Sequence, residues 1–190
     1  MGWTYTHKFP SMSITEYFKA LVSENLEILD SALVNLHEWY AACRDKRNGE
    51  VFALVYLVNS DNRAKDGFNF GYKSMEESMG PCEDNCPERI LNLLTETSNE
   101  WAIEWRQRCR RKIEQRAKAK TIKDGTVVRF SHPLKFTDGE TLDTFTIRKQ
   151  NRKTLFMATI NGMSKLYRIS KWETRPFDVI PTASQLKLTI

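Results

Sequence analysis

The sequence of 190 residues predicts an α+β protein: an N-terminal antiparallel sheet with helices, then a long basic helix, then a small C-terminal β-barrel. Two observations predict this fold class. Before residue 120, helical spacing of apolar residues alternates with continuous β-like apolar runs. Beyond it, short β runs recur about every ten residues between Asp-Gly and Asn-Gly turns, as in small all-β domains.

The first predicted element is an amphipathic helix over about 14–23. Ser13 and Glu16 have the spacing of a capping box, in which each side chain accepts a hydrogen bond from the backbone N–H of the other residue. The apolar residues behind this cap follow helical spacing: Ile14, Tyr17, Phe18 and Leu21.

Three β-like runs follow, at 26–34, 36–43 and 51–58. The last run is apolar on both faces, as expected for a central strand. Asn48-Gly49 separates the second run from the third and supplies the positive φ that a tight hairpin needs. Because residues 68–72 predict one further short strand, we expect an antiparallel meander packed on the first helix.

Two helices are predicted after this sheet. Pro87 suits the first turn of a short helix, where its missing N–H costs nothing, and an apolar face begins at Ile90. The second helix runs over about 99–119, with Thr97 or Ser98 as its cap. Its apolar stripe recurs every four residues: Trp101, Trp105, Cys109 and Ile113.

The second of these helices carries the densest positive charge in the protein. Its basic residues are Arg106, Arg108, Arg110, Arg111, Lys112, Arg116, Lys118 and Lys120, relieved only by Glu104 and Glu114. The sequence pattern changes after Lys120. We therefore predict a boundary near 118–124, which divides the chain into an α+β domain at 1–120 and a β-barrel domain at 121–190.

The C-terminal domain is predicted from five short β runs: 126–130, 141–148, 154–160, 165–169 and 177–180. Turn residues such as Asp124-Gly125 and Asn161-Gly162 separate them. Residues 169–172 would form the short helical turn that SH3-like barrels often place before their last strand. The expected barrel is therefore SH3-like, by analogy of fold.

Bulk composition indicates an intracellular globular protein. The net charge is +5, which permits an anionic partner without requiring one. No apolar run follows a basic start and no apolar stretch reaches membrane-spanning length, so we expect neither a secretory signal nor a membrane partner. We expect a cytoplasmic, reducing setting in which the four cysteines are mostly thiols.

No familiar catalytic or cofactor motif occurs. Both Gly-rich phosphate-binding motifs are missing, so we expect no enzymatic activity and no cofactor. Cys82 and Cys86 form a C-x3-C pair, but a structural zinc site would need Cys43 or Cys109 and a histidine as well. The candidate histidines are His7, His37 and His132. We favour two plain thiols, since a Cys86–Cys109 disulfide is disfavoured in a reducing compartment.

Segment 68–86 is a candidate for an unfamiliar enzymatic site. Besides the two cysteines it holds aromatic and acidic residues: Phe68, Phe70, Tyr72, Glu76, Glu77, Glu83 and Asp84. Paired carboxylates bind metals or act as acid and base catalysts. A core edge strand followed by a solvated loop explains the same residues, and we favour that interpretation.

Four stretches of the N-terminal part have a distinctive sequence. They are Met1-Gly2-Trp3-Thr4-Tyr5-Thr6-His7-Lys8, the block Asn69-Phe70-Gly71-Tyr72-Lys73 with Met75-Glu76-Glu77-Ser78-Met79-Gly80-Pro81, Cys86-Pro87-Glu88-Arg89-Ile90-Leu91, and Trp101 to Arg111. Together they resemble an uncharacterised family of bacterial proteins carried on plasmids, prophages and conjugative elements. The resemblance covers most of residues 1–115. It implies a mobile-element setting, where small proteins often touch nucleic acid or counter host defence, but no activity.

The charge pattern predicts a non-enzymatic accessory protein that binds nucleic acid through the basic helix and the barrel. Arg and Lys neutralise phosphates, and Arg adds bidentate geometry. The barrel adds Arg148, Lys149, Arg152 and Lys153, with further cations at Lys135, Lys165, Arg168 and Lys171. The alternative function is a protein-binding inhibitor of a host defence complex. A solvated helix face explains the same charge without any partner.

Overall fold

The computed structural model describes residues 3–6, 13–61, 69–151 and 153–181. It confirms the predicted α+β class. The chain divides into two compact units, residues 1–111 (the N-terminal unit) and residues 112–190 (the C-terminal unit). This division falls inside the long helix, whereas the sequence pattern placed the boundary after it. His7, Phe68 and Arg152 lie outside the described residues.

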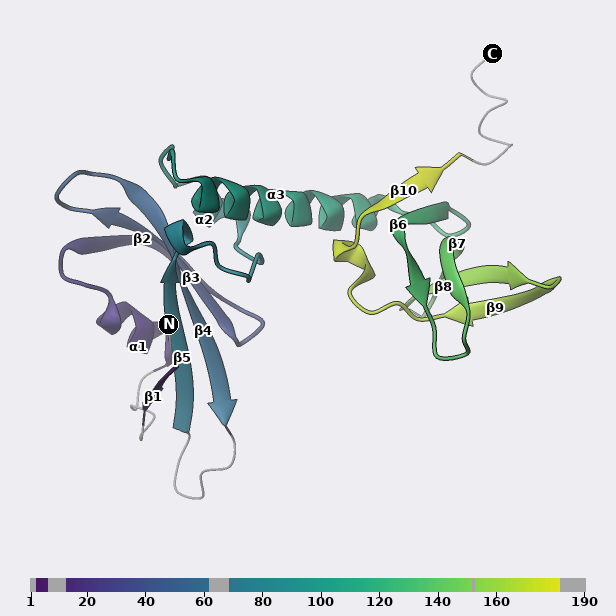
Figure 1. The fold of residues 1–190 in the computed structure, drawn as a ribbon, viewed down its shortest axis with the longest axis horizontal. Coiled ribbons are helices and arrows are strands. Elements are labelled where there is room, and N and C mark those ends of the chain that lie inside the picture. Colours follow the sequence, from purple (N-terminus) through teal and green to yellow (C-terminus); the bar gives the residue numbers. More distant parts are fainter. Residues whose placement is uncertain (1–2, 7–12, 62–68, 152, 182–190) are drawn as a thin grey trace, which may run out of the picture. The chain divides into compact units, whose positions relative to one another are not determined.

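The N-terminal unit is built on a five-stranded antiparallel sheet with the order β1-β5-β4-β3-β2 (Figure 1). Its strands are β1 (Thr4–Thr6), β2 (Leu26–Val34), β3 (Glu38–Asp45), β4 (Val51–Asp61) and β5 (Asn69–Glu76). The predicted meander is confirmed, with β4 as its central strand. Gly49 has a φ of 78° in the β3–β4 turn, as its place after Asn48 predicted. The edge strand β1 gave no clear signal in the sequence, and because β1 pairs with β5, the run at 68–72 does not form the edge strand that the sequence favoured.

The first helix, α1 (Ile14–Leu21), packs on this sheet. Its capping box forms as predicted: Ser13 N donates to Glu16 Oε2 at 2.8 Å, and Glu16 N donates to Ser13 Oγ at 3.3 Å. Phe18 is fully buried, and its ring centroid lies 4.6 Å from that of Tyr56. Because both rings belong to one hydrophobic cluster, the apolar face of α1 seals one side of the sheet.

A 3-10 turn and two helices follow the sheet. They are η1 (Glu77–Met79), α2 (Glu88–Leu91) and α3 (Glu100–Thr121). Tyr40 alternates along β3 with the residues that face α1, and its hydroxyl accepts a hydrogen bond from Asn85 N at 3.2 Å. Trp105 of α3 is fully buried, and its indole N–H donates to Glu83 O at 2.7 Å. The loop that contains Glu83 and Asn85 therefore lies between α3 and the second face of the sheet.

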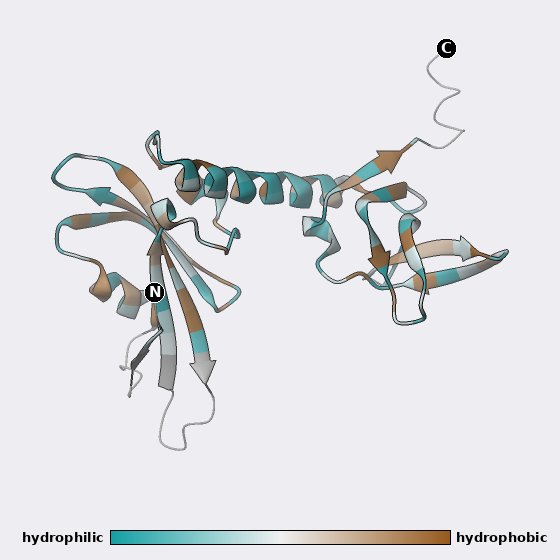
Figure 2. Ribbon diagram, in the orientation of Figure 1, coloured by the Kyte–Doolittle hydropathy of each residue, from teal (hydrophilic) through white to brown (hydrophobic). Residues whose placement is uncertain are grey.

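The helix α3 differs from its prediction at the cap and along the stripe. Asn99 Oδ1 accepts a hydrogen bond from Ala102 N at 2.9 Å, so Asn99 caps the helix. The predicted cap Thr97 instead accepts from Asn99 N at 3.2 Å. Trp101, the first stripe residue, is 62% exposed. Figure 2 shows α3 as largely hydrophilic, and none of the described helices is both long and apolar enough to cross a membrane.

The C-terminal unit is a five-stranded antiparallel sheet with the order β10-β6-β7-β8-β9. Its strands are β6 (Val127–Lys135), β7 (Thr141–Gln150), β8 (Lys153–Ile160), β9 (Met163–Tyr167) and β10 (Phe177–Ile180). All five predicted runs form strands, and the 3-10 turn η2 (Trp172–Thr174) precedes β10. The first strand pairs with the last. Among the described residues no ladder joins β9 to β10, so a closed barrel is not found.

One aromatic core fills the C-terminal unit. Phe156 is fully buried, with ring centroids 5.8 Å from Phe130, 5.8 Å from Phe145 and 5.4 Å from Trp172. Ala119, near the end of α3, belongs to the same cluster. The last turn of α3 is therefore held by the core of this unit, while its first turns belong to the N-terminal unit.

Candidate functional site

Charge divides between the two units far more strongly than the whole-chain value suggests. Residues 1–111 carry 13 Lys and Arg against 17 Asp and Glu, a net charge of −4. Residues 112–190 carry 16 Lys and Arg against 7 Asp and Glu, a net charge of +9. The modest +5 of the whole chain thus conceals an acidic unit and a strongly basic one.

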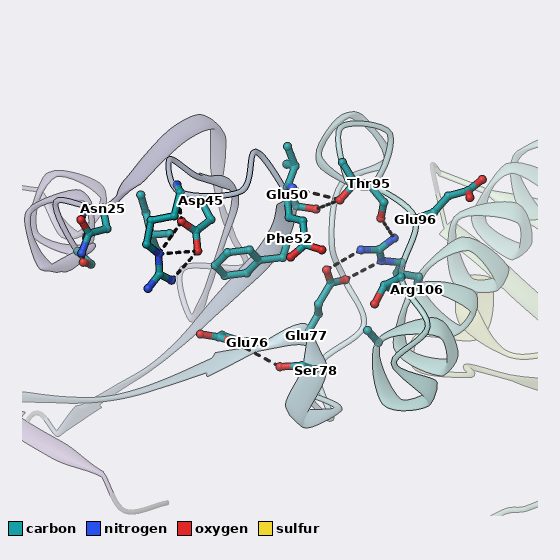
Figure 3. Close-up of a pocket in the computed structure, with 16 residues that line it drawn as sticks. Asn25, Asp45, Glu50, Phe52, Glu76, Glu77, Ser78, Thr95, Glu96 and Arg106 are labelled. Carbon is teal, nitrogen blue, oxygen red and sulfur yellow. Dashed lines mark hydrogen bonds and ion pairs between the residues drawn. The ribbon is translucent and has the colours of Figure 1, made fainter.

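Arg106, the first basic residue of the predicted surface, is enclosed in the N-terminal unit (Figure 3). Its Nε donates to Glu77 Oε2 at 2.7 Å and its Nη2 donates to Glu77 Oε1 at 2.6 Å. Its Nη1 donates to Thr95 O at 2.6 Å. The Glu77 side chain is 3% exposed and the Arg106 side chain 15%, and Glu77 also accepts from Ala53 N at 3.2 Å. This guanidinium is committed to the fold.

The next arginines of α3 also bond to protein groups. Arg108 donates to Pro81 O at 2.6 Å and to Glu104 Oε1 at 3.1 Å, which fastens the loop after η1 to the helix. Arg110 donates to Asn92 Oδ1 at 3.2 Å. Arg111 donates to Gln107 O at 3.4 Å, within its own helix. Among these four arginines, Arg110 and Arg111 are exposed and present their charge to solvent.

The remaining basic residues of α3 belong to the C-terminal unit. Lys118 donates to the carbonyl oxygen of Phe177 and lies 3.6 Å from Asp178 Oδ1. Its ammonium also lies 4.8 Å from the centroid of the Phe177 ring. Lys112 and Arg116 are half-buried, and both make contacts with other residues. Lys120 is exposed and makes no ion pair with any residue that the structure describes.

The β7–β8 hairpin presents the predicted cations of the sheet. Arg148 Nη1 lies 3.4 Å from Asp124 Oδ2. The backbone N–H of Lys149 donates to Asp124 Oδ1 at 2.7 Å, which leaves its ammonium exposed. Lys153, the first residue of β8, is also exposed. One carboxylate thus anchors the hairpin while the two lysine ammonium groups stay in solvent.

Three cations line a hollow of about 480 Å³ in the C-terminal unit. They are Lys153, Arg168 and Lys171, and none makes an ion pair with a residue that the structure describes. The remaining described lining residues are Thr154, Ile169, Ser170, Trp172 and Glu173. We call these eight residues the basic hollow. Two hydroxyl-bearing residues and three cations without a described ion pair thus line one space together with Glu173.

The fold, not the sequence spacing, brings these cations together. Phe156 of β8 pairs with Tyr167 of β9, so the start of β8 lies beside the residues that follow β9. Trp172 is buried against Phe156 and fixes the turn that carries Lys171. The sequence identified Arg168 and Lys171 as general contributors of charge, but it gave no reason to group them with Lys153.

A second cavity, of about 490 Å³, lies in the N-terminal unit and is acidic (Figure 3). Its described charged residues are Asp45, Glu50, Glu76, Glu77 and Glu96, against Arg47 and Arg106. Arg47 Nη2 lies 2.6 Å from Asp45 Oδ2, and its hydrogen bonds lower the pKa of Asp45 to about 2. This cavity would repel a nucleic acid. Glu77 of the candidate enzymatic segment 68–86 lines this cavity, but its carboxylate is already paired with Arg106.

The cysteines show no arrangement for chemistry among the described residues. Cys43, Cys86 and Cys109 are buried free thiols, whereas Cys82 is exposed. Burial raises the pKa of Cys43 to about 12 and raises that of Cys86 as well, which disfavours the thiolate needed for nucleophilic attack or metal binding. No three His, Cys, Asp or Glu side chains of the described segments converge as metal ligands.

Comparison with known proteins assigns no activity. Residues 96–172 match a domain of unknown function, DUF6927. No curated protein and no solved structure matches the chain. The matched segment contains α3, β6 to β9 and the three cations of the basic hollow. It overlaps the resemblance noted for residues 1–115 only at its start, and both point to uncharacterised families.

Proposed function

We propose that this chain is a non-enzymatic accessory protein of a mobile element that binds the nucleic-acid backbone through its C-terminal unit. The supporting observation is the net charge of +9 on residues 112–190, against −4 on the preceding residues. Phosphate neutralisation by Lys and Arg releases counterions, which supplies most of the sequence-independent affinity for nucleic acids. The mobile-element setting rests on the resemblance of the N-terminal stretches.

Exposed cations without a carboxylate partner form the proposed surface. Within the described part of the unit they are Lys120, Lys123, Arg129, Lys135, Lys149, Lys153, Arg168, Lys171 and Arg175. The sequence prediction named all of them except Lys123, Arg129 and Arg175. Arg106 and Arg108 were predicted too, but their hydrogen bonds to carboxylate and carbonyl oxygens give them a role in holding the N-terminal unit together.

Fluorescence anisotropy with short single- and double-stranded DNA and RNA tests this proposal. We expect binding that weakens roughly 10³-fold between 50 and 200 mM salt if most of these cations contact phosphates. A Lys149→Gln/Lys153→Gln variant should lower the slope of log affinity against log salt by about 2. The matched Arg110→Gln/Arg111→Gln variant should leave it unchanged. Failure of all four nucleic acids to bind at low salt would contradict the proposal.

A protein-binding function is the second candidate, and one observation favours it. Trp101 is 62% exposed and Met79 50%, an apolar pair beside Gly80 of the N-terminal unit. Gly80 has a φ of 61°, and a Cβ there would lie 3.0 Å from Trp101 Cε3, so the turn and the indole are closely fitted. Exposed tryptophans are enriched at interaction hot spots.

Affinity purification from a bacterial host lysate tests this second candidate. We expect a stoichiometric protein that the full-length chain retains and a Trp101→Ala variant loses. Thermal melting of the variant serves as the folding control, because an exposed side chain contributes little to stability. Recovery of the same proteins by both forms would remove the candidate.

A further inference from the structure

The basic hollow differs from the rest of the positive surface because its cations, which come from two separate segments of the chain, line one space. Lys153 begins β8, Arg168 follows β9, and Lys171 precedes η2. Three cations around one space repel one another, and Glu173, the carboxylate among the described lining residues, offsets only one of these charges, so a further anion between them is favoured. Solvent screens isolated surface lysines well, but a concave wall focuses their field on its interior.

The lining also defines what kind of anion fits. Arg168 provides a planar donor fork, the two lysines provide point charges, and Thr154 and Ser170 provide hydroxyl groups. Such donors suit the several oxygens of a phosphate. Among the described lining residues the one aromatic side chain, Trp172, is 6% exposed and packs in the core, so it offers no free face for a base to stack on.

We infer that the basic hollow binds one phosphate group of a nucleic-acid chain together with its sugar, without reading the base. The inference rests on the proposed function and names its central contact. The volume of about 480 Å³ is far larger than a bare ion needs, and the hollow is open to solvent, so a strand can continue past it. The phosphate comes either from within a strand or from a strand terminus, and both present the same oxygens to the hollow.

Backbone conformation supports a role for Lys171. Its φ of 52° and ψ of 32° lie in the left-handed region, which L-residues other than Asn and Gly rarely occupy. Glycine would adopt this conformation without strain, yet the position carries a cation that lines the hollow. Strained residues often occur at binding sites, because the conformation aims a side chain that the unstrained backbone would not.

Two matched variants of the full chain test the inference. The hollow variant carries Lys153→Gln, Arg168→Gln and Lys171→Gln. The control variant carries Lys120→Gln, Lys123→Gln and Lys135→Gln, which removes the same charge from exposed sites of the same unit. Amide NMR spectra of both variants, compared with the wild type, report whether each remains folded. The probes are inorganic phosphate and a short single-stranded DNA with or without a 5′-phosphate.

We expect inorganic phosphate to shift the amide signals of Thr154, Ser170 and Lys171 in the wild type and the control variant. For DNA, the hollow variant should lose about 3 from the salt slope. The control variant should lose clearly less, about 1 to 2, because its lysines belong to the surrounding positive surface. Equal losses would overturn the inference and leave the proposed function standing, because a diffuse field would then explain binding. No DNA binding by the wild type would overturn the proposed function itself.

Comparison of the DNA strands with and without a 5′-phosphate identifies the source of the phosphate. Wild-type binding about tenfold tighter to the 5′-phosphorylated strand would support a terminal phosphate in the hollow. Equal affinity for both strands, combined with the loss in the hollow variant, would support an internal phosphodiester. If phosphate shifts amides elsewhere in the unit but not those of the hollow, the assignment of the site is wrong.

Discussion

In the N-terminal unit the arginines at the start of α3 turn toward the protein, whereas in the C-terminal unit most lysines end in solvent. Arg106 donates to the Glu77 carboxylate in η1, and Arg108 donates to the carbonyl oxygen of Pro81 in the loop after it. Lys149, Lys153 and Lys171 make no ion pair with any described residue. Similar charges along the chain thus serve two purposes, cohesion in one unit and a free positive surface in the other.

This contrast shows why the number of basic residues in a helix is a poor measure of a binding surface. A guanidinium can satisfy several backbone carbonyl groups at once, which makes it useful wherever loops must be fastened to a helix. The ammonium groups of Lys149 and Lys153, near the end of β7 and at the start of β8, are exposed and hydrated. A variant that replaces Arg106 would therefore lower the stability of the N-terminal unit, so its effect on nucleic-acid binding would not report a contact with phosphate.

The largest expected effect comes from Arg106→Ala. The substitution leaves the Glu77 carboxylate, 3% exposed, without its bidentate partner. Removing one member of a buried ion pair typically costs about 3–5 kcal/mol, because an uncompensated charge remains in the interior. Urea unfolding should show this loss. Arg110→Ala, which removes an exposed side chain bonded to Asn92, is the control and should cost less than about 1 kcal/mol. Equal losses would mean that Arg106 is not a structural residue.

Much of the fold could be predicted because its signals are local. The Ser13–Glu16 box and the Asn48-Gly49 turn act within a few residues, and each forms as expected. The β2–β3 turn was misjudged. The sequence predicted that the second β run starts at Leu36, but Asn35 and Leu36 both have positive φ and make the turn. Leu36 is not a turn residue by type, and the local signal was Asn35, a residue that tolerates positive φ.

The candidate site was predictable only in outline, because its parts depend on tertiary contacts. The engagement of Arg106 depends on Glu77, which arrives from the end of the sheet. The grouping of Lys153 with Arg168 depends on the register of β8 against β9. Neither relation has a sequence spacing that reports it. Composition located the charge, and pairing decided which cations remain free.

A smaller effect is expected when the residue with positive φ in each unit, Leu36 or Lys171, is replaced by glycine. Leu36 has a φ of 61° and Lys171 a φ of 52°. Replacing either by glycine relieves the strain, and we expect each protein to gain about 0.5–1 kcal/mol in urea unfolding. Only Lys171→Gly should also weaken nucleic-acid binding, with the salt slope lower by about 1. Loss of binding in both variants, or in neither, would break the functional distinction between the units.

The smallest expected effect concerns pH and the acidic unit. Hydrogen bonds from Arg47 lower the pKa of Asp45 from an ordinary value of 3.8 to about 2. A depressed folded-state pKa contributes stability that is complete above the unfolded value and disappears as the pH falls through the folded one. Wild type should therefore be more stable than Asp45→Asn at pH 7, and this difference should shrink between about pH 4 and pH 2. Urea unfolding across that range measures this difference in the free energy of unfolding.

The control is Glu50→Gln, which removes an exposed carboxylate of the same cavity and so controls for the loss of a negative charge. If the stabilities of the two variants depend on pH in the same way, the Asp45–Arg47 pair contributes no more than any exposed charge. The stabilising role of arginine in the N-terminal unit would then not extend from Arg106 to Arg47.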